Sequence, residues 1–284
     1  MNLIERSCPA CLETVWRHVQ DIETYTIQKC SGCGLIRVSV VTREDLDGFY
    51  EFIYFNNESS ELIGYKKYST NYKADRLNYL RFHKDLIDLS PGRRLFDVGA
   101  AHGLLVKVMQ EVGWSAKGID PSLYATNLAQ KEYGVDIQCG TLEEYDFCGQ
   151  TFDVVTLIGV FEHLVNPRLS LEKIKSILNP GGLLLIVTLN AGRFLHVYKY
   201  KPPEHLYYFN LPQLKQMLSR HGFDIKISKP YFRIYKLSEF LYRVNHLLFP
   251  WLVKPIDYLF KYFPFLDVCC RLPTNEMFVV AKKR

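Results

Sequence analysis

Short apolar strands alternate with helices through the middle of this 284-residue chain, and that alternation restricts the fold more than any other feature of the sequence. The first strand covers residues 94–98 and runs through a glycine-containing turn into a helix at 104–112. Such short connections predict a parallel sheet that helices cover on both faces, with ligands bound at the carboxyl ends of the strands. Further strands are expected at 115–119, 135–139, 152–160 and 183–189.

The turn after the first strand contains residues suited to a nucleoside cofactor. Gly99 lets the chain turn sharply out of the strand, and Gly103 lets the helix begin close to a ligand. Asp120 ends the second strand 21 residues after Gly99, where a carboxylate can accept hydrogen bonds from two ribose hydroxyls. A nicotinamide dinucleotide would require G-x-G-x-x-G, but the turn reads D-x-G-x-x-x-G. Asp97 would repel a pyrophosphate, whereas it suits a cofactor that carries ammonium and sulfonium charges.

Five segments, in the same order, resemble the motifs of the class I S-adenosylmethionine-dependent methyltransferases. They read LFDVGAAHG, GIDPS, GTLE, FDVVTLIGVFEHLVNP and LNPGGLLLIVTLN. The resemblance covers residues 90–230 and a closing strand at 276–283. It implies an α/β fold with a Rossmann-like, doubly wound, seven-stranded sheet whose last strand is antiparallel.

The resemblance also implies that S-adenosylmethionine is the co-substrate. In the family's pattern Asp120 binds the cofactor ribose, and the GTLE segment lines the adenine. Ala101 stands where the family's first motif usually has its middle glycine. His102 would touch the cofactor from inside the turn, or alternatively cap the helix. The predicted cofactor-binding residues are Asp97, Gly99, Ala101, His102, Gly103, Asp120, Thr141, Leu142 and Glu143.

Methyl transfer from a sulfonium is an in-line displacement, so the acceptor atom must lie about 3 Å from the methyl carbon. A hydroxyl acceptor must also lose its proton. Glu162 and His163 close the fourth strand, and in the resembling family this pair borders the methyl site, with the histidine sometimes acting as the base. A hydrogen bond that only holds the loop is the alternative role of His163.

A second candidate segment lies between the fifth strand and the next helix, where the resembling family commonly builds its acceptor pocket. It reads PPEHLYYF at 202–209, and the two prolines stiffen the approach. His205 is a candidate base, and Tyr207 or Tyr208 is a candidate for orienting the acceptor. A His/Tyr cluster that caps the sheet is the alternative.

Four of the eight cysteines form two C-x-x-C pairs near the start of the chain. Cys8 and Cys11 make the first pair, and Cys30 and Cys33 make the second. Two such knuckles, joined by a predicted hairpin, complete a tetrahedral shell of four sulfurs suited to zinc. Because the shell leaves no open position, the predicted role of the zinc is structural. Residues 1–41 are therefore predicted to form a zinc ribbon.

Residues 42–90 predict a helical lead-in to the methyltransferase domain, which is assigned to 91–284. Tyr65, Lys66 and Tyr68 lie in this lead-in, where relatives in the resembling family often fold a lid over the methionine end of the cofactor. A plain surface helix is the alternative.

Basic and aromatic residues concentrate in the last third of the chain. Residues 1–190 carry a net charge of −5, whereas residues 191–284 carry +10 and half of the aromatic residues. An insertion at 230–271 interrupts the closing hairpin and predicts a helical cap, the alternative being contact with a membrane surface through 236–266. A basic pocket here would suit an anionic acceptor such as a nucleotide-sugar diphosphate.

These features predict a methyltransferase acting on a small molecule, by O-methylation of a sugar, nucleotide-sugar or glycan precursor. Sugar C-methylation is one alternative, because some sugar C-methyltransferases carry a similar four-cysteine module. A zinc-ribbon rRNA or tRNA methyltransferase is the other, but the balanced charge of residues 1–41 argues against nucleic acid. The chain has no apolar run of about 18 residues and no secretory signal, which predicts a cytoplasmic protein. The oligomeric state is left open.

Overall fold

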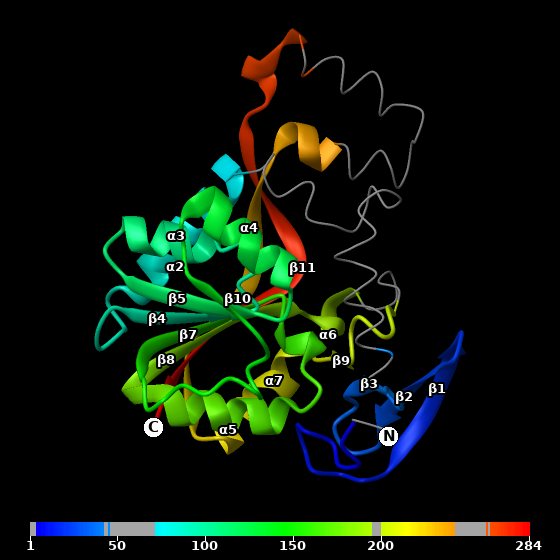
Figure 1. Cartoon of the computed structure of the whole chain (residues 1–284). Helices are drawn as coiled ribbons and strands as arrows, with labels where there is room; N and C mark the ends of the chain where they lie inside the picture. The colour runs from blue at the N-terminus through cyan, green and yellow to red at the C-terminus, as the bar shows by residue number, and fades with distance from the viewer. Residues whose placement is uncertain (1–3, 43–44, 46–71, 195–199, 242–259, 261) are drawn as a thin grey trace.

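The computed structural model describes residues 4–42, 45, 72–194, 200–241, 260 and 262–284, and in this part of the chain the strands form a large and a small β-sheet (Figure 1). The large sheet has the order β10-β11-β8-β7-β4-β5-β6. Strands β8, β7, β4, β5 and β6 run parallel, whereas β11 pairs antiparallel with both β8 and β10. The predicted Rossmann-like, seven-stranded α/β sheet with an antiparallel end is therefore confirmed. The strands are β4 (Arg94–Val98), β5 (Ser115–Asp120), β6 (Ile137–Cys139), β7 (Phe152–Ile158), β8 (Leu178–Leu189), β10 (Phe223–Lys236) and β11 (Cys269–Lys283).

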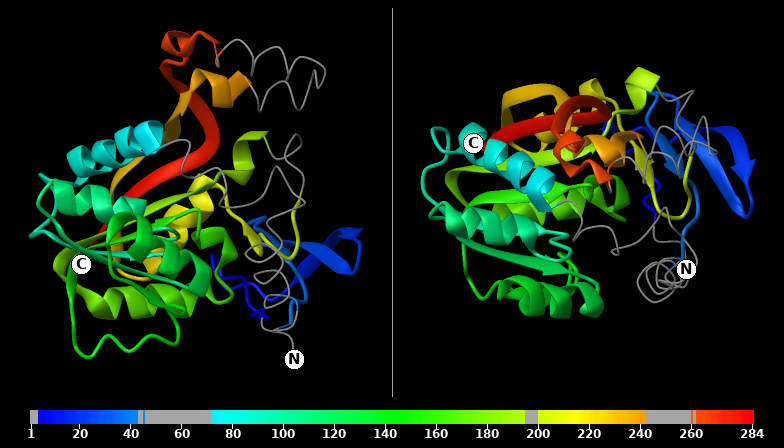
Figure 2. Two further views of the ribbon diagram at one scale, coloured as in Figure 1. Left: turned by 45° about the horizontal axis from the view of Figure 1, so that its top comes forward. Right: turned by 90° about the horizontal axis from the view of Figure 1, so that it is seen from above.

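Helices cover both faces of the large sheet, as the sequence predicts (Figures 1 and 2). Helices α2, α3 and α4 pack on one face, and α5 and α7 pack on the other. Neighbouring residues of a strand point to opposite faces, so Val154 packs with the first group of helices and Val155 with the second. The helices are α2 (Tyr72–Leu86), α3 (Leu104–Glu111), α4 (Leu123–Tyr133), α5 (Pro167–Ile177), α6 (Ala191–Phe194) and α7 (Leu211–Arg220).

Helix caps fix where two loops of the site end. Asn166 accepts a hydrogen bond from the N–H of Leu169 at the start of α5, whose first residue is a proline. Asn210 and Gln213 form a reciprocal capping box at the start of α7. Each helix therefore begins at a defined residue directly after a segment that carries a predicted catalytic histidine.

The small sheet joins the N-terminal ribbon to the methyltransferase fold. Its order is β1-β2-β3-β9, and β1 and β2 form the predicted hairpin. Strand β9 belongs to the predicted acceptor segment: Arg37 of β3 pairs with Tyr207, and the N–H of Val38 donates to the carbonyl of Leu206 at 3.0 Å. The ribbon thus shares a sheet with the residues that follow His205. The strands are β1 (Trp16–Ile22), β2 (Tyr25–Cys30), β3 (Ile36–Val38) and β9 (Tyr207–Tyr208).

The closing hairpin is longer than the sequence predicts, so the predicted bounds of the insertion, 230–271, are wrong. Strand β10 continues to Lys236 and β11 begins at Cys269, and these two residues pair. Pro230 does not end the strand, because β10 is at the sheet edge and its register shifts between Pro230 and Phe232. The insertion therefore starts after Lys236 and ends before Cys269, on an arm that rises from the body of the protein (Figure 2).

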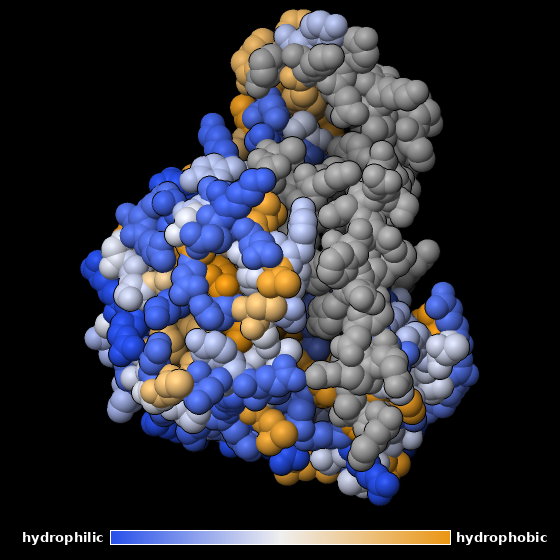
Figure 3. Space-filling model, viewed as in Figure 1, coloured by the Kyte–Doolittle hydropathy of each residue, from blue (hydrophilic) through white to orange (hydrophobic). Residues whose placement is uncertain are grey.

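Apolar side chains are exposed at the far end of this arm (Figure 3). They surround the short 3-10 helix η5 (Pro264–Leu266), where Phe263 is 48% exposed and Phe265 is 74% exposed. A helix begins at residue 237, directly after β10. Among the described residues, none of the helices has the length and apolar character needed to cross a bilayer.

Two predicted features fall outside the described residues. The lid residues Tyr65, Lys66 and Tyr68 are one of them. Most of the predicted membrane-contact segment, 236–266, is the other. Both stay predictions.

Candidate active site

The bend after β4 brings the predicted cofactor residues to the carboxyl edge of the sheet. Gly99 leaves β4 with a φ of 71°, and its N–H donates to the carbonyl of Ile119 in β5 at 2.8 Å. A Cβ on Gly99 would lie 2.3 Å from Cγ2 of Val160, so the turn requires glycine at this position. The N–H of Ala101 donates to Oδ2 of Asp120 at 2.8 Å, which ties the bend to the end of β5.

Two buried carboxylates, Asp97 and Asp120, flank the bend. Asp97 accepts a hydrogen bond from Oγ1 of Thr156 at 2.5 Å, and Asp120 accepts one from the N–H of Ser122 at 2.9 Å. Burial raises the pKa of Asp97 to about 7 and that of Asp120 to about 6. A cationic ligand beside these groups would favour their charged forms. The bend is therefore suited to a ligand with the sulfonium and ammonium charges of the predicted cofactor.

The rest of the bend closes against α3 and α4. Gly103 has a φ of 77°, and a Cβ there would lie 2.6 Å from Cγ2 of Val135. The His102 ring lies against the ring of Tyr133, with 5.8 Å between centroids. Burial lowers the pKa of His102 to about 4, so this imidazole is neutral at pH 7 and adds no positive charge near the bend.

The segment after β6 reaches the same edge, because the N–H of Gly140 donates to the carbonyl of Asp120 at 3.0 Å. Leu142 is buried, and the Thr141 hydroxyl donates to a neighbouring carboxylate at 2.9 Å. Glu143 accepts a hydrogen bond from a serine hydroxyl of α5 at 2.7 Å. All nine predicted cofactor residues thus lie on or beside the carboxyl ends of β4, β5 and β6.

Glu162 and His163 lie in η3 (Phe161–His163), the single 3-10 turn that follows β7. The buried Glu162 carboxylate accepts a hydrogen bond from Oγ1 of Thr188, near the end of β8, at 2.7 Å. The carbonyl of Glu162 accepts a hydrogen bond from the N–H of Leu206 at 2.9 Å. The turn after β7 is therefore joined both to β8 and to the PPEHLYYF segment.

The structure brings His163 and His205 together, although 41 residues separate them in the sequence. Their rings meet edge to face with 4.9 Å between centroids, and Nδ1 of His163 is hydrogen-bonded to the carbonyl of Glu204. Nε2 of His205 lies 3.6 Å from the Glu204 carboxylate. Burial, helped by the charges of His163 and Lys201, lowers the pKa of His205 to about 3. The His205 imidazole is therefore neutral at pH 7 and a weak base, and the lone pair of its unprotonated nitrogen is free to bind a metal ion.

The structure does not bring Tyr207 to the histidine pair. Tyr207 is fully buried on the ribbon side, and its hydroxyl lies 3.5 Å from the carbonyl of Val165. Tyr208 points to the other face of β9, where its ring lies 5.9 Å from that of His205 and its hydroxyl accepts a hydrogen bond from the N–H of Lys201 at 2.7 Å. Of the two tyrosines named in the sequence analysis, Tyr208 is therefore the one beside the histidines.

The four N-terminal cysteines converge as a metal site requires. Their sulfurs all lie within 4.8 Å of one another, with Cys8 and Cys33 at 3.5 Å and Cys11 and Cys30 at 3.4 Å. Sulfurs bound to one tetrahedral zinc ion are about 3.8 Å apart. A hydrogen bond from Cys8 lowers the pKa of the Cys33 thiol to about 5, so one sulfur already has thiolate character. The cluster fits zinc, and the four sulfurs would fill its shell.

The zinc knuckles also contact α7 of the methyltransferase fold. Nε2 of Gln213 donates to the carbonyl of Cys33 at 2.8 Å, and the Arg220 guanidinium donates to the carbonyl of Ala10 at 2.9 Å. Together with the β3–β9 pairing, these contacts attach the ribbon next to the acceptor segment.

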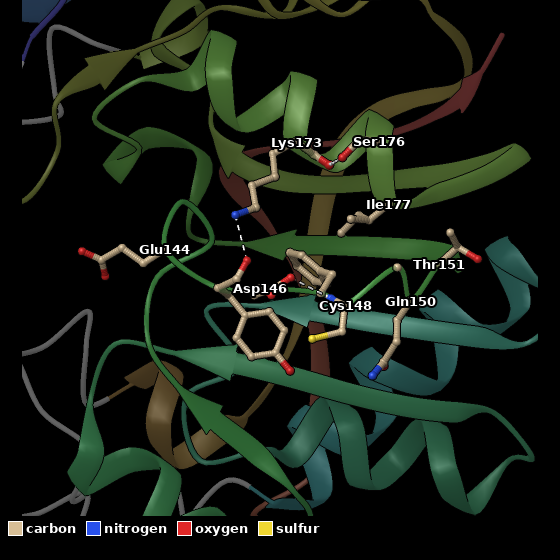
Figure 4. Close-up of a pocket in the computed structure, with 11 residues that line it drawn as sticks. Glu144, Asp146, Cys148, Gln150, Thr151, Lys173, Ser176 and Ile177 are labelled. Atoms are coloured by element: carbon tan, nitrogen blue, oxygen red, sulfur yellow. Dashed lines mark hydrogen bonds between the residues drawn. The ribbon is translucent and has the colours of Figure 1, made fainter.

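A cavity of about 460 Å³ lies between the loop 144–151 and α5, away from this edge (Figure 4). Thr151 and Ile177, which line it, precede the amino ends of β7 and β8. Lys173 crosses toward the loop and donates to the carbonyl of Tyr145 at 2.8 Å. Because ligands of this fold bind at the carboxyl ends of the strands, we do not assign the cavity to the reaction.

Residues 65–226, more than half of the chain, match the family model described as a methyltransferase domain. The chain belongs to this methyltransferase family. The match includes both carboxylates of the bend and both histidines of the acceptor edge. The predicted class I methyltransferase, with S-adenosylmethionine as its co-substrate, is confirmed by this membership.

Curated relatives also match part of the chain. The ubiquinone biosynthesis O-methyltransferase of Parvibaculum lavamentivorans is 31% identical over 140 residues, which is 45% of this chain and 55% of the relative. The enzyme of the same name from Azorhizobium caulinodans is 34% identical over 128 residues, 40% of this chain and 51% of the relative. The chain thus spans about half the length of the curated relatives it matches.

Solved structures share the fold of this methyltransferase at low sequence identity. A methyltransferase structure from Thermotoga maritima aligns with a TM-score of 0.52 and 17% identity, covering 75% of this chain and 91% of that one. A methyltransferase structure from Archaeoglobus fulgidus aligns with a TM-score of 0.50 and 19% identity, covering 73% and 93%. These likenesses support the fold.

Three polar residues of the site were missed in the sequence analysis. Thr156 and Thr188 lie near the carboxyl ends of β7 and β8, and each donates to a buried carboxylate. A hydroxyl residue inside an apolar run, VVTLI in β7 and LLLIVTL in β8, was the signal that could have identified both. Glu204 directly precedes His205, but its contact with His163 depends on tertiary structure and left no signal in the sequence.

Proposed function

We propose that this methyltransferase transfers the methyl group of S-adenosylmethionine to a hydroxyl group of a small molecule. One observation carries the proposal: a bend with two buried carboxylates and a pair of buried or half-buried imidazoles occur at the same carboxyl edge of the sheet. The carboxylates follow β4 and β5, and the first imidazole follows β7. A cationic donor and an acceptor that must lose a proton would therefore meet between them.

In this proposal the carboxylates bind the donor. Asp120 accepts hydrogen bonds from the ribose hydroxyls, and Asp97 supplies negative charge close to the sulfonium and ammonium groups. The backbone of Gly99, Ala101 and Gly103 lies against the methionine part, with His102 beside it. Thr141, Leu142 and Glu143 then line the adenine.

The acceptor hydroxyl would lie beside His163 and His205, which activate it. A neutral imidazole does this either by accepting the proton itself or by binding a cation that acidifies the hydroxyl. The buried carboxylate of Glu162 lies next to both imidazoles and helps to position them. Of the two tyrosines predicted for the positioning role, Tyr207 and Tyr208, we assign it to Tyr208, because that ring contacts His205.

An oxygen acceptor is favoured over carbon and over RNA. The curated relatives are named O-methyltransferases. We retain an anionic or saccharide acceptor as the finer proposal, supported by the net charge of +10 in residues 191–284. A test is to incubate the zinc-loaded protein with methyl-labelled S-adenosylmethionine and either small-molecule extracts or total RNA. Label in small molecules is expected, and label in RNA alone would overturn the proposal.

We also propose that the end of the β10–β11 arm contacts a lipid surface. Phe263 and Phe265 are exposed there, and the net charge of +10 in residues 191–284 favours an anionic bilayer. Co-sedimentation with phosphatidylglycerol vesicles, but not with phosphatidylcholine vesicles, is expected. Equal sedimentation of a Phe263→Ser, Phe265→Ser variant would contradict it.

The Cys8, Cys11, Cys30 and Cys33 cluster would bind a structural zinc, with residues 1–41 as the ribbon, 42–90 as the lead-in and 91–284 as the catalytic domain. The contacts from the ribbon to β9 and α7 support a role for the zinc in holding the acceptor segment. We expect the ribbon to unfold when a chelator removes the zinc.

A further inference from the structure

We infer that Glu162, His163 and His205 bind a divalent transition-metal ion at the acceptor edge. One carboxylate oxygen and one nitrogen from each imidazole lie within 4.8 Å of one another. Two ligands of one tetrahedral ion, at bond lengths of about 2.1 Å, are about 3.4 Å apart. The three groups therefore need to close by up to about 1.4 Å to bind one ion. The inference rests on the proposed function, because it uses the same edge as the acceptor site.

Hydrogen bonds hold His163 and Glu162, and a carboxylate lies close to His205, as partners do around metal ligands. Nδ1 of His163 is hydrogen-bonded to the Glu204 carbonyl, which directs the lone pair of its Nε2 away from that carbonyl. Nε2 of His205 lies 3.6 Å from the Glu204 carboxylate, and Thr188 holds one oxygen of Glu162. Partners of these kinds, a carbonyl or carboxylate behind each imidazole, fix the ring orientation at metal sites.

The surroundings also favour a cation at this point. Glu162 and His205 are buried, and the carboxylate of Glu162 brings negative charge to two imidazoles. Lys201, whose Nζ lies 3.9 Å from the Glu204 carboxylate, is the nearby cation, and Glu204 lies between it and His205.

The ligand set determines which ions would bind. Two imidazoles and one carboxylate suit zinc, manganese, iron or cobalt in the divalent state, whereas magnesium and calcium prefer oxygen ligands. Three protein ligands leave positions open, as in catalytic sites, unlike the four-cysteine cluster of the ribbon. Two adjacent open positions would take two neighbouring oxygens, so the acceptor class is a vicinal dioxygen compound such as a catechol or a saccharide diol.

Such an ion would activate the acceptor in a defined way. Coordination lowers the pKa of the bound hydroxyl, which releases its proton to water. The oxygen lone pair then forms the bond to the methyl carbon while the carbon–sulfur bond breaks. Its electron pair returns to the sulfur, which leaves neutral S-adenosylhomocysteine. The two imidazoles hold the ion throughout and take no proton.

The test is a titration of the zinc-loaded protein with Mn²⁺, followed by the electron paramagnetic resonance signal of the free ion. Manganese does not compete for four thiolates, so the ribbon does not interfere. We expect one Mn²⁺ per chain, with affinity about 100-fold lower in Glu162→Gln and His205→Asn and about tenfold lower in Thr188→Val. His221→Asn, a half-buried histidine outside the cluster, is the matched control and should bind like the wild type.

Binding of S-adenosylhomocysteine reports separately on the fold of each variant, because the carboxylate-flanked bend lies on other strands. Unchanged Mn²⁺ affinity in folded Glu162→Gln and His205→Asn would overturn the inference, as would no Mn²⁺ uptake by a wild type that binds S-adenosylhomocysteine. If a variant does not fold, the wild-type spectrum decides: two nitrogen couplings support the site and none overturns it. The proposed function fails differently, through absence of cofactor binding or methyl transfer.

The two acceptor chemistries are distinguished with the Mn²⁺-loaded protein. Addition of 3,4-dihydroxybenzoate should change the bound Mn²⁺ spectrum if the site takes catechols, and addition of methyl α-mannoside should change it if the site takes saccharide diols. A spectrum that neither compound changes would overturn the vicinal dioxygen assignment.

Discussion

The cofactor end and the acceptor end of the site lie on one sheet edge but are assembled from different parts of the chain. The cofactor end comes from residues 97–143, two consecutive strand–helix units and the strand β6, which backbone hydrogen bonds join. The acceptor end joins His163, His205 and the ribbon strand β3, which are far apart in the sequence. In the proposed function, cofactor binding therefore needs only the central sheet, whereas acceptor chemistry also needs the zinc ribbon.

The variant with the largest expected effect tests whether the cofactor end and the acceptor end are independent. Cys30→Ser should disrupt the zinc shell, release the β3–β9 pairing and lower acceptor turnover at least about 100-fold, because structural zinc supplies the folding energy of such modules. S-adenosylhomocysteine affinity should change by less than about threefold, because the bend shares no strand with the ribbon. Calorimetry and labelled-methyl transfer measure the two quantities.

Ser31→Ala, next to the same knuckle, is the control for this variant, because its side chain bonds only the exposed carbonyl of Val15. If Cys30→Ser weakens cofactor binding as much as turnover, the two ends are not independent.

The next largest effect concerns the cofactor end alone. Asp120→Asn should weaken S-adenosylhomocysteine binding by about 30- to 100-fold, since hydrogen bonds to a charged acceptor contribute about 1.5–3 kcal/mol. The Mn²⁺ affinity of the acceptor edge should stay unchanged. Glu143→Gln is a useful comparison, because that carboxylate already accepts a hydrogen bond from α5. A parallel loss of Mn²⁺ binding in Asp120→Asn would argue against separate ends.

Cofactor binding should also depend on pH. Burial raises the pKa of Asp97 to about 7 in the free protein, so most of this carboxyl is protonated at pH 6. A cationic cofactor binds the ionised form, and binding must then release the proton, so affinity should fall about tenfold between pH 8 and pH 6. Calorimetry in two buffers of different ionisation enthalpy measures the released proton. Asp97→Asn should reduce the dependence to about twofold, the part that Asp120 contributes with its pKa of about 6. Affinity that rises toward pH 6 would be inconsistent with this assignment.

The smallest effect distinguishes the two tyrosines of β9. Tyr208→Phe removes the hydroxyl that accepts the N–H of Lys201, and loss of such a partner should lower the free energy of unfolding by about 1–2 kcal/mol. Tyr207→Phe, whose hydroxyl lies 3.5 Å from its nearest carbonyl, should change it by less than about 0.5 kcal/mol. Urea unfolding compares the pair. A larger loss of stability in Tyr207→Phe than in Tyr208→Phe would contradict this assignment of the two hydroxyl hydrogen bonds.

The sequence predicted the central sheet and its cofactor end well, because strand–helix alternation and a glycine turn are local patterns. Gly99, Gly103 and Asp120 stand where a bend of this kind needs them, and the bend forms as expected. The hairpin bounds were wrong, since an edge strand tolerates Pro230 through a register shift that no local pattern indicates. The roles of the individual site residues stay predictions.

The sequence predicted the residues of the acceptor end as separate candidates, but it could not predict that these residues come together. His163 and His205 meet only because β9 turns back against η3, and β9 is held by the ribbon. The two-residue length of β9 leaves no periodic signal, and alternation along it decides which tyrosine reaches the histidines. Such contacts depend on tertiary packing and not on local sequence.

Calorimetric titration of S-adenosylmethionine into the zinc-loaded protein at pH 8 tests most directly whether the carboxylate-flanked bend holds the methyl donor. We predict one molecule bound per chain, and Asp97→Asn should bind it at least about tenfold more weakly, because a carboxylate beside a cation is lost. Saturable binding of equal strength in the wild type and in Asp97→Asn, or no binding by the folded wild type, would contradict the account.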